Sequence, residues 1–179
     1  NIPAVKMAYL VGVQDIIDTA KAMGVEGLLG ASNYGLSIAL GAADVSVLDM
    51  TSAYRVFAND GIKSDVEGIL KIEDSKGGTL YETATSSKRV LPEQTARMMN
   101  DVLADPRARN SIFVLNYFKN DVVAVKTGTT NDSRDAWMLG YTPTVVVGAW
   151  MGNNDNRPMS QLASALTVGP LWKTIMDDL

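Results

Sequence analysis

The chain has 179 residues, 46% of them hydrophobic, with a formal net charge of −4 and a pI of about 4.8. It is therefore long enough for one domain with a sizeable core, and its acidic balance argues against a nucleic-acid partner, which would require a basic face. The absence of cysteine and histidine excludes disulfides, thiolate nucleophiles, His-ligated metals and Ser-His-Asp catalysis, so any proton transfer must use Lys, Asp, Glu, Tyr or water.

The N-terminal part of the sequence predicts two helices separated by a loop. Asn1-Ile2-Pro3 leads into the first, whose apolar residues recur at helical spacing up to Met23, and Gly24 is placed to end it. The stretch from Gly24 to Gly41 is rich in glycine and small residues, which indicates loop or turn. A second helix is expected from Asp44 or Ser46, either of which is a good N-cap, to about Asn59.

The middle of the chain changes to a hairpin pattern. Leu70 and Ile72 alternate with Lys71 before Gly77-Gly78, and Leu80 follows, so two short strands around a glycine pair are predicted. The segment Thr83 to Arg89 is expected to be a polar linker. Leu91-Pro92-Glu93 then opens a third helix that Pro106 stops.

The C-terminal third predicts closely spaced strands. Asp121 to Lys126, Ala136 to Tyr141 and Val145 to Met151 are apolar runs, the last two joined by a turn at Thr142-Pro143-Thr144. Gly152 to Pro158 indicates a loop. A final helix is expected from Gly169, with Leu171, Trp172 and Ile175 packed on the sheet. Helices followed by short-turn strands are typical of an α+β fold with an antiparallel sheet.

Lys126-Thr127-Gly128-Thr129 is the segment whose chemistry suggests a binding site. Lys126 supplies a cation with three donors at a strand end, and Thr127 and Thr129 point to one face because side chains two apart on a strand do so. Gly128 removes a side chain that would block an approaching backbone, so an extended peptide could pair with the strand edge. The amide of Thr129 is suitably placed as an oxyanion donor. A lone Lys-Thr-Gly also arises by chance and is weak evidence by itself, so an ordinary strand end is the alternative.

The surrounding sequence is more specific than the tripeptide. The stretch VAVKTGTTNDSRDAWMLGYTPTVVVGAWMGNND, from Val123 to Asp155, resembles the region around the third active-site motif of class A penicillin-binding proteins, which polymerise and cross-link peptidoglycan. NIPAVKMA, YGLSIALGAADVSVLDMTSAYRVFANDG and GPLWKTIM are similar to the same family and stand in its order. The resemblance spans nearly the whole chain and implies the penicillin-binding protein/β-lactamase-like transpeptidase fold, an antiparallel sheet flanked by helices, incomplete at its N-terminal side.

The resemblance also implies roles for individual residues. Penicillin-recognising enzymes carry the motifs S-x-x-K, S-D-N or S-x-N, and K-T-G, and the third stands here as Lys126-Thr127-Gly128. By likeness Lys126, Thr127 and Thr129 bind the substrate carboxylate, the Thr129 amide completes the oxyanion hole, and Asn1 is the last residue of the second motif. Thr130, with Asn131 and Asp132, is expected to line the cleft mouth, with a plain turn as the alternative.

No serine in the sequence has lysine three positions later or asparagine two positions later. The nearest match, Thr85-Ser86-Ser87-Lys88, begins with threonine in a polar segment. By the resemblance, the nucleophilic serine and its lysine are expected upstream of Asn1, with a glycosyltransferase domain and a membrane anchor further upstream. Residues 1–179 are accordingly expected to be the C-terminal part of a transpeptidase domain. No apolar run approaches the roughly 18–20 residues that span a bilayer.

The implied function is a serine D,D-transpeptidase that cross-links peptidoglycan stem peptides and is acylated by β-lactams, on the extracytoplasmic side of the bacterial plasma membrane. The expected partners are stem peptides and β-lactam antibiotics, with no nucleic acid, no metal, no cofactor, and membrane contact only through the upstream anchor. Two alternatives stay open. One is a β-lactamase or D,D-carboxypeptidase, against which the match from Asp135 to Asp155 argues; the other is a non-catalytic scaffold that kept the cleft.

Several further residues are interpreted as structural. Arg134 and Asp135 could form an ion pair that holds a loop, but solvated charges are the more common outcome for such neighbours. The tryptophans at positions 137, 150 and 172 favour packing over sugar binding. Ser52 is followed three residues later by Arg55, but its place on an amphipathic helix favours a structural role.

Overall fold

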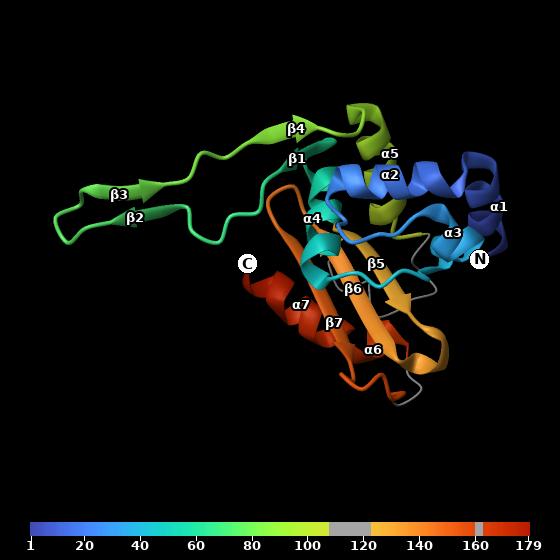
Figure 1. Ribbon diagram of the computed structural model, residues 1–179. Helices are drawn as coiled ribbons and strands as arrows, with labels where there is room; N and C mark the ends of the chain where they lie inside the picture. The colour runs from blue at the N-terminus through green and yellow to red at the C-terminus, as the bar shows by residue number, and fades with distance from the viewer. Residues whose placement is uncertain (108–122, 160–162) are drawn as a thin grey trace.

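The computed structural model describes residues 1–107, 123–159 and 163–179. At its centre is an antiparallel sheet of order β5-β6-β7, whose strands are Ala124–Thr129, Asp135–Tyr141 and Val146–Gly152 (Figure 1). One face of the sheet packs on the short helix α6 (Ser164–Thr167) and on α7 (Gly169–Asp178). The core on this side is formed by Val123, Val125, Ala136, Met138, Val147, Ala149, Val168 and Trp172.

The other face of the sheet is covered by α4 (Val47–Ala58) and α5 (Glu93–Ala104). Ser46 begins α4 as the sequence predicts, because its hydroxyl accepts a 3.0 Å hydrogen bond from the amide of Asp49. Leu103, Ala124 and Tyr141 are buried between these helices and the sheet. The layered helices and antiparallel sheet confirm the predicted α+β class.

The N-terminal helices form a third layer, packed against α4 rather than against the sheet. They are α1 (Ile2–Val11), α2 (Val13–Met23), α3 (Ala31–Tyr34) and the 3₁₀-helix η1 (Gly35–Leu40). The prediction of one helix up to Met23 was wrong, because Gly12 adopts φ 98° and breaks it in two. The predicted loop from Gly24 to Gly41 was also partly wrong, since α3 and η1 lie within it, whereas Gly24 does end α2 in the left-handed conformation.

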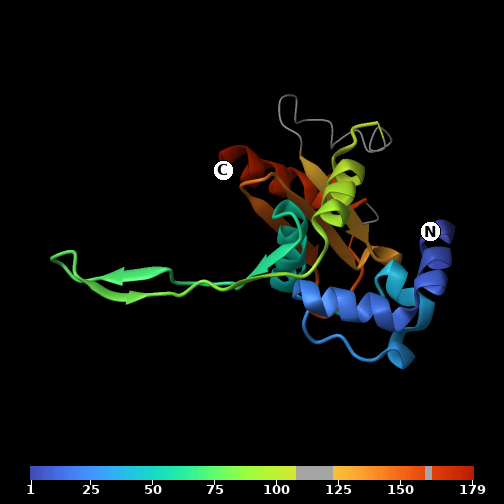
Figure 2. The ribbon, with the colours of Figure 1, turned by 90° about the horizontal axis from the view of Figure 1, so that it is seen from above.

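A long two-stranded arm projects from the body of the molecule (Figures 1 and 2). Its tip is the predicted hairpin, β2 (Lys71–Glu73) paired with β3 (Thr79–Glu82). Its base is β1 (Ile62–Ser64) paired with β4 (Ser87–Arg89), so the expected polar linker up to Arg89 contains a strand. All residues of β2 and β3 are exposed, which shows that this hairpin contributes little to the core.

The third helix, the last two strands and the final helix confirm the sequence prediction to within about a residue. The first strand ends later than predicted, at Thr129 instead of Lys126, and the predicted Asp121 and Val122 lie outside the described residues. In α7 only Trp172 of the three predicted packing residues is buried, whereas Leu171 and Ile175 are exposed. The face of the helix that packs on the sheet carries residues spaced four apart: Val168, Trp172 and Met176.

Candidate active site

The Lys-Thr-Gly-Thr segment occupies the second half of β5, and its backbone is open on one side. The amide of Thr130 donates to the carbonyl of Asp135 at 3.2 Å, which makes these two residues a hydrogen-bonded pair of the ladder. Such pairs alternate along antiparallel strands, so Gly128 and Lys126 direct their backbone groups to β6. The N–H and C=O groups of Thr127 and Thr129 therefore point away from β6, along the edge that β5 leaves unpaired among the described strands.

Lys126 brings its charge to this open edge. Its ammonium group donates a hydrogen bond to the carbonyl of Thr127, one of the outward-pointing groups. Partial desolvation by the surrounding protein lowers the pKa of Lys126 from its ordinary value of 10.5, although the residue as a whole remains exposed. No carboxylate among the described residues lies within ion-pair distance of Lys126. The cation is therefore available to an anion that approaches the edge.

The hydroxyl of Thr129 is held by a residue that the sequence analysis did not identify. Its oxygen lies 2.6 Å from the Ser164 hydroxyl oxygen, and the Ser164 amide donates to it at 3.3 Å. Ser164 is 35 residues away in sequence, at the first turn of α6, and no local pattern marks it. On the opposite face of β5, a Cβ atom on Gly128 would lie 3.3 Å from the Cβ of Trp137, so a side chain here would crowd the cross-strand partner.

The loop between β5 and β6 is closed by hydrogen bonds to Asp135. Its carboxylate accepts from the indole N–H of Trp150 at 2.9 Å and from the hydroxyl of Thr130 at 3.1 Å. The less favoured reading, an Arg134–Asp135 ion pair, is not found among the described residues: the Arg134 guanidinium lies 3.8 Å from the Asp132 carboxylate and also donates to the Asn156 carbonyl. The Thr130 hydroxyl therefore helps to hold the loop between β5 and β6 closed.

Asn1 stands at the start of α1, exposed, and no hydrogen bond between the described residues joins its side chain to β5. In both views the start of α1 lies on the side of the molecule towards which β5 runs (Figures 1 and 2).

The residues interpreted as structural differ in their burial. Trp172 is 0% exposed and donates its indole N–H to the Val147 carbonyl at 2.9 Å, which confirms a packing role. Trp137 and Trp150 are only half-buried, as is Ser52 on α4.

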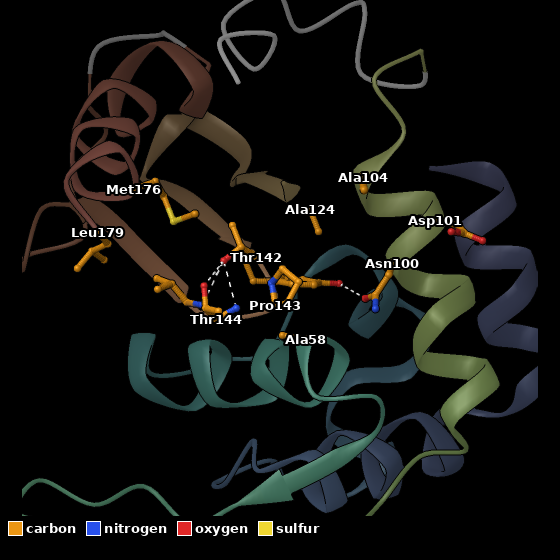
Figure 3. A pocket seen from close by; sticks show the side chains of 12 residues that line it. Ala58, Asn100, Asp101, Ala104, Ala124, Thr142, Pro143, Thr144, Met176 and Leu179 are labelled. Carbon is orange, nitrogen blue, oxygen red and sulfur yellow. Dashed lines mark hydrogen bonds between the residues drawn. The ribbon is translucent and has the colours of Figure 1, made fainter. Parts of the chain in front are cut away.

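A cavity of about 600 Å³ lies at the other end of the sheet, near the turn between β6 and β7 (Figure 3). Asn100 of α5 reaches into it and accepts a 2.6 Å hydrogen bond from the hydroxyl of Tyr141. Ala124, which begins β5, lines this cavity, so the cavity lies about 17 Å along the strand from Thr129. The cavity contains none of the predicted site residues, and the chemistry of the open β5 edge is separate from it.

The edge of β5 combines a cation, two hydroxyls and an outward-pointing amide. This set suits an extended anionic peptide, because the charge and hydroxyls can bind a carboxylate while the amide of Thr129 stabilises a developing oxyanion. Within the described ranges no three potential metal ligands gather, and no described helix has the length and apolarity to cross a bilayer.

Comparison with known proteins identifies the family. Residues 1–177 match the family described as penicillin binding protein transpeptidase domain. Among curated relatives, penicillin-binding protein 1A of Aquifex aeolicus is 33% identical over 96% of this chain, and penicillin-binding protein 2D of Bacillus subtilis is 32% identical over 99% of it. These alignments cover 23% and 26% of the two relatives, so the chain spans about a quarter of their length.

Solved structures have the same fold. The crystal structure of penicillin-binding protein 1A from Haemophilus influenzae superposes with a TM-score of 0.84 at 24% identity, covering 99% of this chain and 32% of that one. PonA1 of Mycobacterium tuberculosis in complex with penicillin V superposes with a TM-score of 0.73 at 25% identity, covering 92% of this chain and 49% of the other. The chain belongs to the penicillin-binding protein transpeptidase domain family, which confirms the resemblance found in the sequence and the fold that it implied.

Proposed function

We propose that this chain forms part of a serine D,D-transpeptidase that cross-links peptidoglycan stem peptides and is acylated by β-lactams. The observation that carries the proposal is the open edge of β5, where the Lys126 ammonium and the outward N–H groups of Thr127 and Thr129 meet in a member of this family. In the same proposal, residues 1–179 are the C-terminal part of the transpeptidase domain. A membrane anchor and a glycosyltransferase domain belong to the rest of the protein, which works outside the plasma membrane.

The substrate of this proposal is a stem peptide that ends in D-Ala-D-Ala. Its extended backbone pairs with the unpaired edge of β5 as an added strand, since that edge presents alternating donors and acceptors. The terminal carboxylate is bound by Lys126 together with the hydroxyls of Thr127 and Thr129. Because Lys126 has no carboxylate partner among the described residues, the substrate carboxylate supplies the missing countercharge.

The amide of Thr129 serves the chemical step. A serine hydroxyl attacks the penultimate D-Ala carbonyl, and negative charge develops on the carbonyl oxygen, which the amide N–H stabilises. The C–N bond then breaks, and the terminal D-Ala leaves with the proton that the serine gave up. The amine of a second stem peptide attacks the resulting ester and regenerates the serine. Since no Ser-x-x-Lys occurs in the sequence, the serine and its lysine base belong to another part of the protein.

Asn1 and Thr130 have supporting places in this proposal. Asn1 corresponds to the last residue of the S-x-N motif and would contact the substrate amide or the proton-transfer groups. Thr130 would shape the cleft mouth, since its hydroxyl both accepts from the Asp135 amide at 2.7 Å and donates to the Asp135 carboxylate.

Covalent labelling of the full-length protein by a fluorescent penicillin tests the proposal. The wild-type protein should be labelled, and Lys126→Ala should lower the second-order rate constant of acylation about 10- to 100-fold, because a hydrogen bond to a charged group is lost. Lys76→Ala, at the tip of the arm, is a matched lysine control that should label at the wild-type rate. The 179-residue chain by itself should carry no label.

The alternatives give different results in the same assay. A non-catalytic scaffold leaves the wild-type protein unlabelled, which would refute the enzyme. A β-lactamase passes the penicilloyl group to water, so its label turns over quickly. A D,D-carboxypeptidase passes the stem-peptide acyl group to water, so an added stem-peptide amine yields no cross-linked dimer. A transpeptidase gives a long-lived penicilloyl adduct and, with stem peptides, the dimer.

A further inference from the structure

Ser164 is the one buried residue with a non-aromatic polar side chain in the part of the chain that the structure describes, with 1% of its surface exposed. It lies at the first turn of α6, against the end of β5. Its hydroxyl donates to the carbonyl of Gly128 at 2.5 Å and lies 2.6 Å from the hydroxyl of Thr129, while its amide donates to the same Thr129 oxygen at 3.3 Å. The hydroxyl and the amide of this buried residue are thus both directed at Gly128 and Thr129.

The three contacts fix where the hydroxyl protons lie. A serine hydroxyl has one proton, and that of Ser164 is committed to the Gly128 carbonyl. Thr129 must therefore be the donor in the 2.6 Å contact between the two hydroxyls. The Thr129 oxygen remains anchored by the Ser164 amide, whereas its proton can rotate from Ser164 to another acceptor without moving the side chain.

The contact to Gly128 acts on the neighbouring amide. The Gly128 carbonyl and the Thr129 N–H belong to one planar peptide unit, so a bond that holds the carbonyl also sets the direction of the N–H. Hydrogen bonding at the carbonyl also polarises the unit and strengthens the N–H as a donor. Ser164 therefore acts on both groups that Thr129 contributes to the edge of β5.

We propose that Ser164 is a positioning residue for Thr129: it aims the Thr129 hydroxyl at the substrate carboxylate and holds the peptide plane whose N–H faces the oxyanion. This inference rests on the proposed function of the β5 edge and adds a determinant of specificity to it. When a carboxylate binds, the Thr129 proton turns to it and the Ser164 amide keeps the oxygen in place. A ligand without a carboxylate gains nothing from the aimed hydroxyl and depends on Ser164 only through the Thr129 N–H.

The test compares the free acid of a penicillin with its methyl ester on the full-length protein. The quantity measured is the acid-to-ester ratio of second-order acylation rate constants. General damage to the site, or a poorer oxyanion donor, lowers both rate constants and leaves the ratio unchanged. Ser164→Ala should lower the ratio about 3- to 10-fold, the range expected for losing one neutral hydrogen-bond partner, and should lower acylation by the ester as well.

Thr129→Val and the double variant complete a cycle. Thr129→Val removes the hydroxyl and should lower the ratio at least as much as Ser164→Ala, and adding Ser164→Ala to it should lower the ratio by less than about 2-fold, because both changes remove the same contact. Ser52→Ala, a half-buried serine on α4, is the matched control and should keep the wild-type ratio. If Ser164→Ala unfolds the domain, Ser164→Cys keeps a weaker hydrogen-bonding group of similar shape and should give an intermediate ratio.

The outcomes separate this inference from the proposed function. A wild-type protein that no penicillin acylates refutes the function and the inference together. If the wild type is acylated and Ser164→Ala keeps its ratio, the positioning role is refuted while the transpeptidase proposal stands. If Thr129→Val keeps the ratio, Thr129 does not bind the carboxylate, and the role given to Ser164 falls for that reason.

Discussion

Gly140→Ala should destabilise the domain, because Gly140 lies directly under the indole ring of Trp172. A Cβ atom built on Gly140 would be 2.4 Å from the Cζ2 atom of Trp172 and 2.7 Å from the carbonyl oxygen of Ala124. Carbon atoms in contact are normally about 3.5–4.0 Å apart, so the indole must move by about 1 Å or β6 must separate from β5. Trp172 is 0% exposed, so its indole can move only by disturbing the side chains packed around it.

The cost has two parts. Overpacking a filled core typically costs about 1–3 kcal/mol. Displacing the indole also strains its 2.9 Å hydrogen bond to the Val147 carbonyl, which contributes about 0.5–1.5 kcal/mol. Together these give a loss of about 2–4 kcal/mol in the free energy of unfolding, or a fall of roughly 5–15 °C in the melting temperature of a domain of this size.

Calorimetric melting of the full-length protein measures the effect, followed on the transition of the transpeptidase domain. Gly68→Ala is the matched control, since a Cβ there meets no atom within 4 Å and the variant should melt within about 1 °C of the wild type. In a Trp172→Leu background the added cost of Gly140→Ala should shrink, because the indole atoms that the new Cβ would meet are gone. A cost that is the same in both backgrounds, or below about 0.5 kcal/mol, would show that the contact with the indole is not the cause.

Three further predictions concern the site and the arm. Desolvation lowers the pKa of Lys126 from 10.5, so its charge is lost as pH rises through that lowered value. The rate of penicillin acylation should therefore fall with rising pH, with its midpoint below pH 10.5. In Lys126→Arg this alkaline fall should vanish, because arginine keeps its charge. Asp135→Ala leaves the Trp150 indole N–H without its acceptor and should speed amide hydrogen exchange across residues 130–134, whereas Asp132→Ala, at a side chain 71% exposed, should not. Replacing residues 69–83 by a short Gly-Ser turn should leave the melting temperature and penicillin labelling nearly unchanged, because β2 and β3 are wholly exposed; a large loss of either would assign the arm a role in the core or the site.

The elements that the sequence predicted well are those whose local pattern and tertiary packing agree. Ser46 caps α4, and the apolar runs of β6 and β7 lie in the sheet as their composition indicated. The misses have specific causes. β4 is Ser-Lys-Arg, a wholly exposed strand that pairs with β1 through its backbone alone, so no hydrophobic alternation marks it.

Two other errors, the helix break at Gly12 and the buried face of α7, arose because the hydrophobic pattern of the sequence does not determine them. Gly12 lies between two valines in a continuous apolar stretch, and only its φ of 98° reveals that one helix ends and another begins. In α7 Leu171 and Ile175 form one apolar row and Trp172 and Met176 form the adjacent one, so the sequence alone leaves open which row is buried. The position of Gly140, which leaves room for the Trp172 indole, selects the face that packs on the sheet.

The candidate site divides in the same way, into a local part that the sequence reveals and a tertiary part that it does not. Lys126, Thr127 and Thr129 are neighbours on one strand, so strand geometry alone places the two hydroxyls on one face and the cation near the same edge. Ser164 reaches Thr129 across 35 residues from the first turn of a four-residue helix, and neither periodicity nor spacing records that contact.

Gly128 connects these two parts of the site. It lies opposite Trp137 in the ladder, so the glycine of Lys-Thr-Gly and the tryptophan of Asp-Ala-Trp, which are separate features in the sequence, form one cross-strand unit. On the Trp137 face the strand tolerates no Cβ at this position without a shift, and on the other face Ser164 holds the Gly128 carbonyl. The peptide between Gly128 and Thr129 is therefore held by Ser164 on one face, while the missing side chain of Gly128 lets Trp137 lie close on the other, and its N–H points along the open edge. A preorganised donor of this kind is what oxyanion stabilisation requires, since it avoids reorganisation at the moment of reaction.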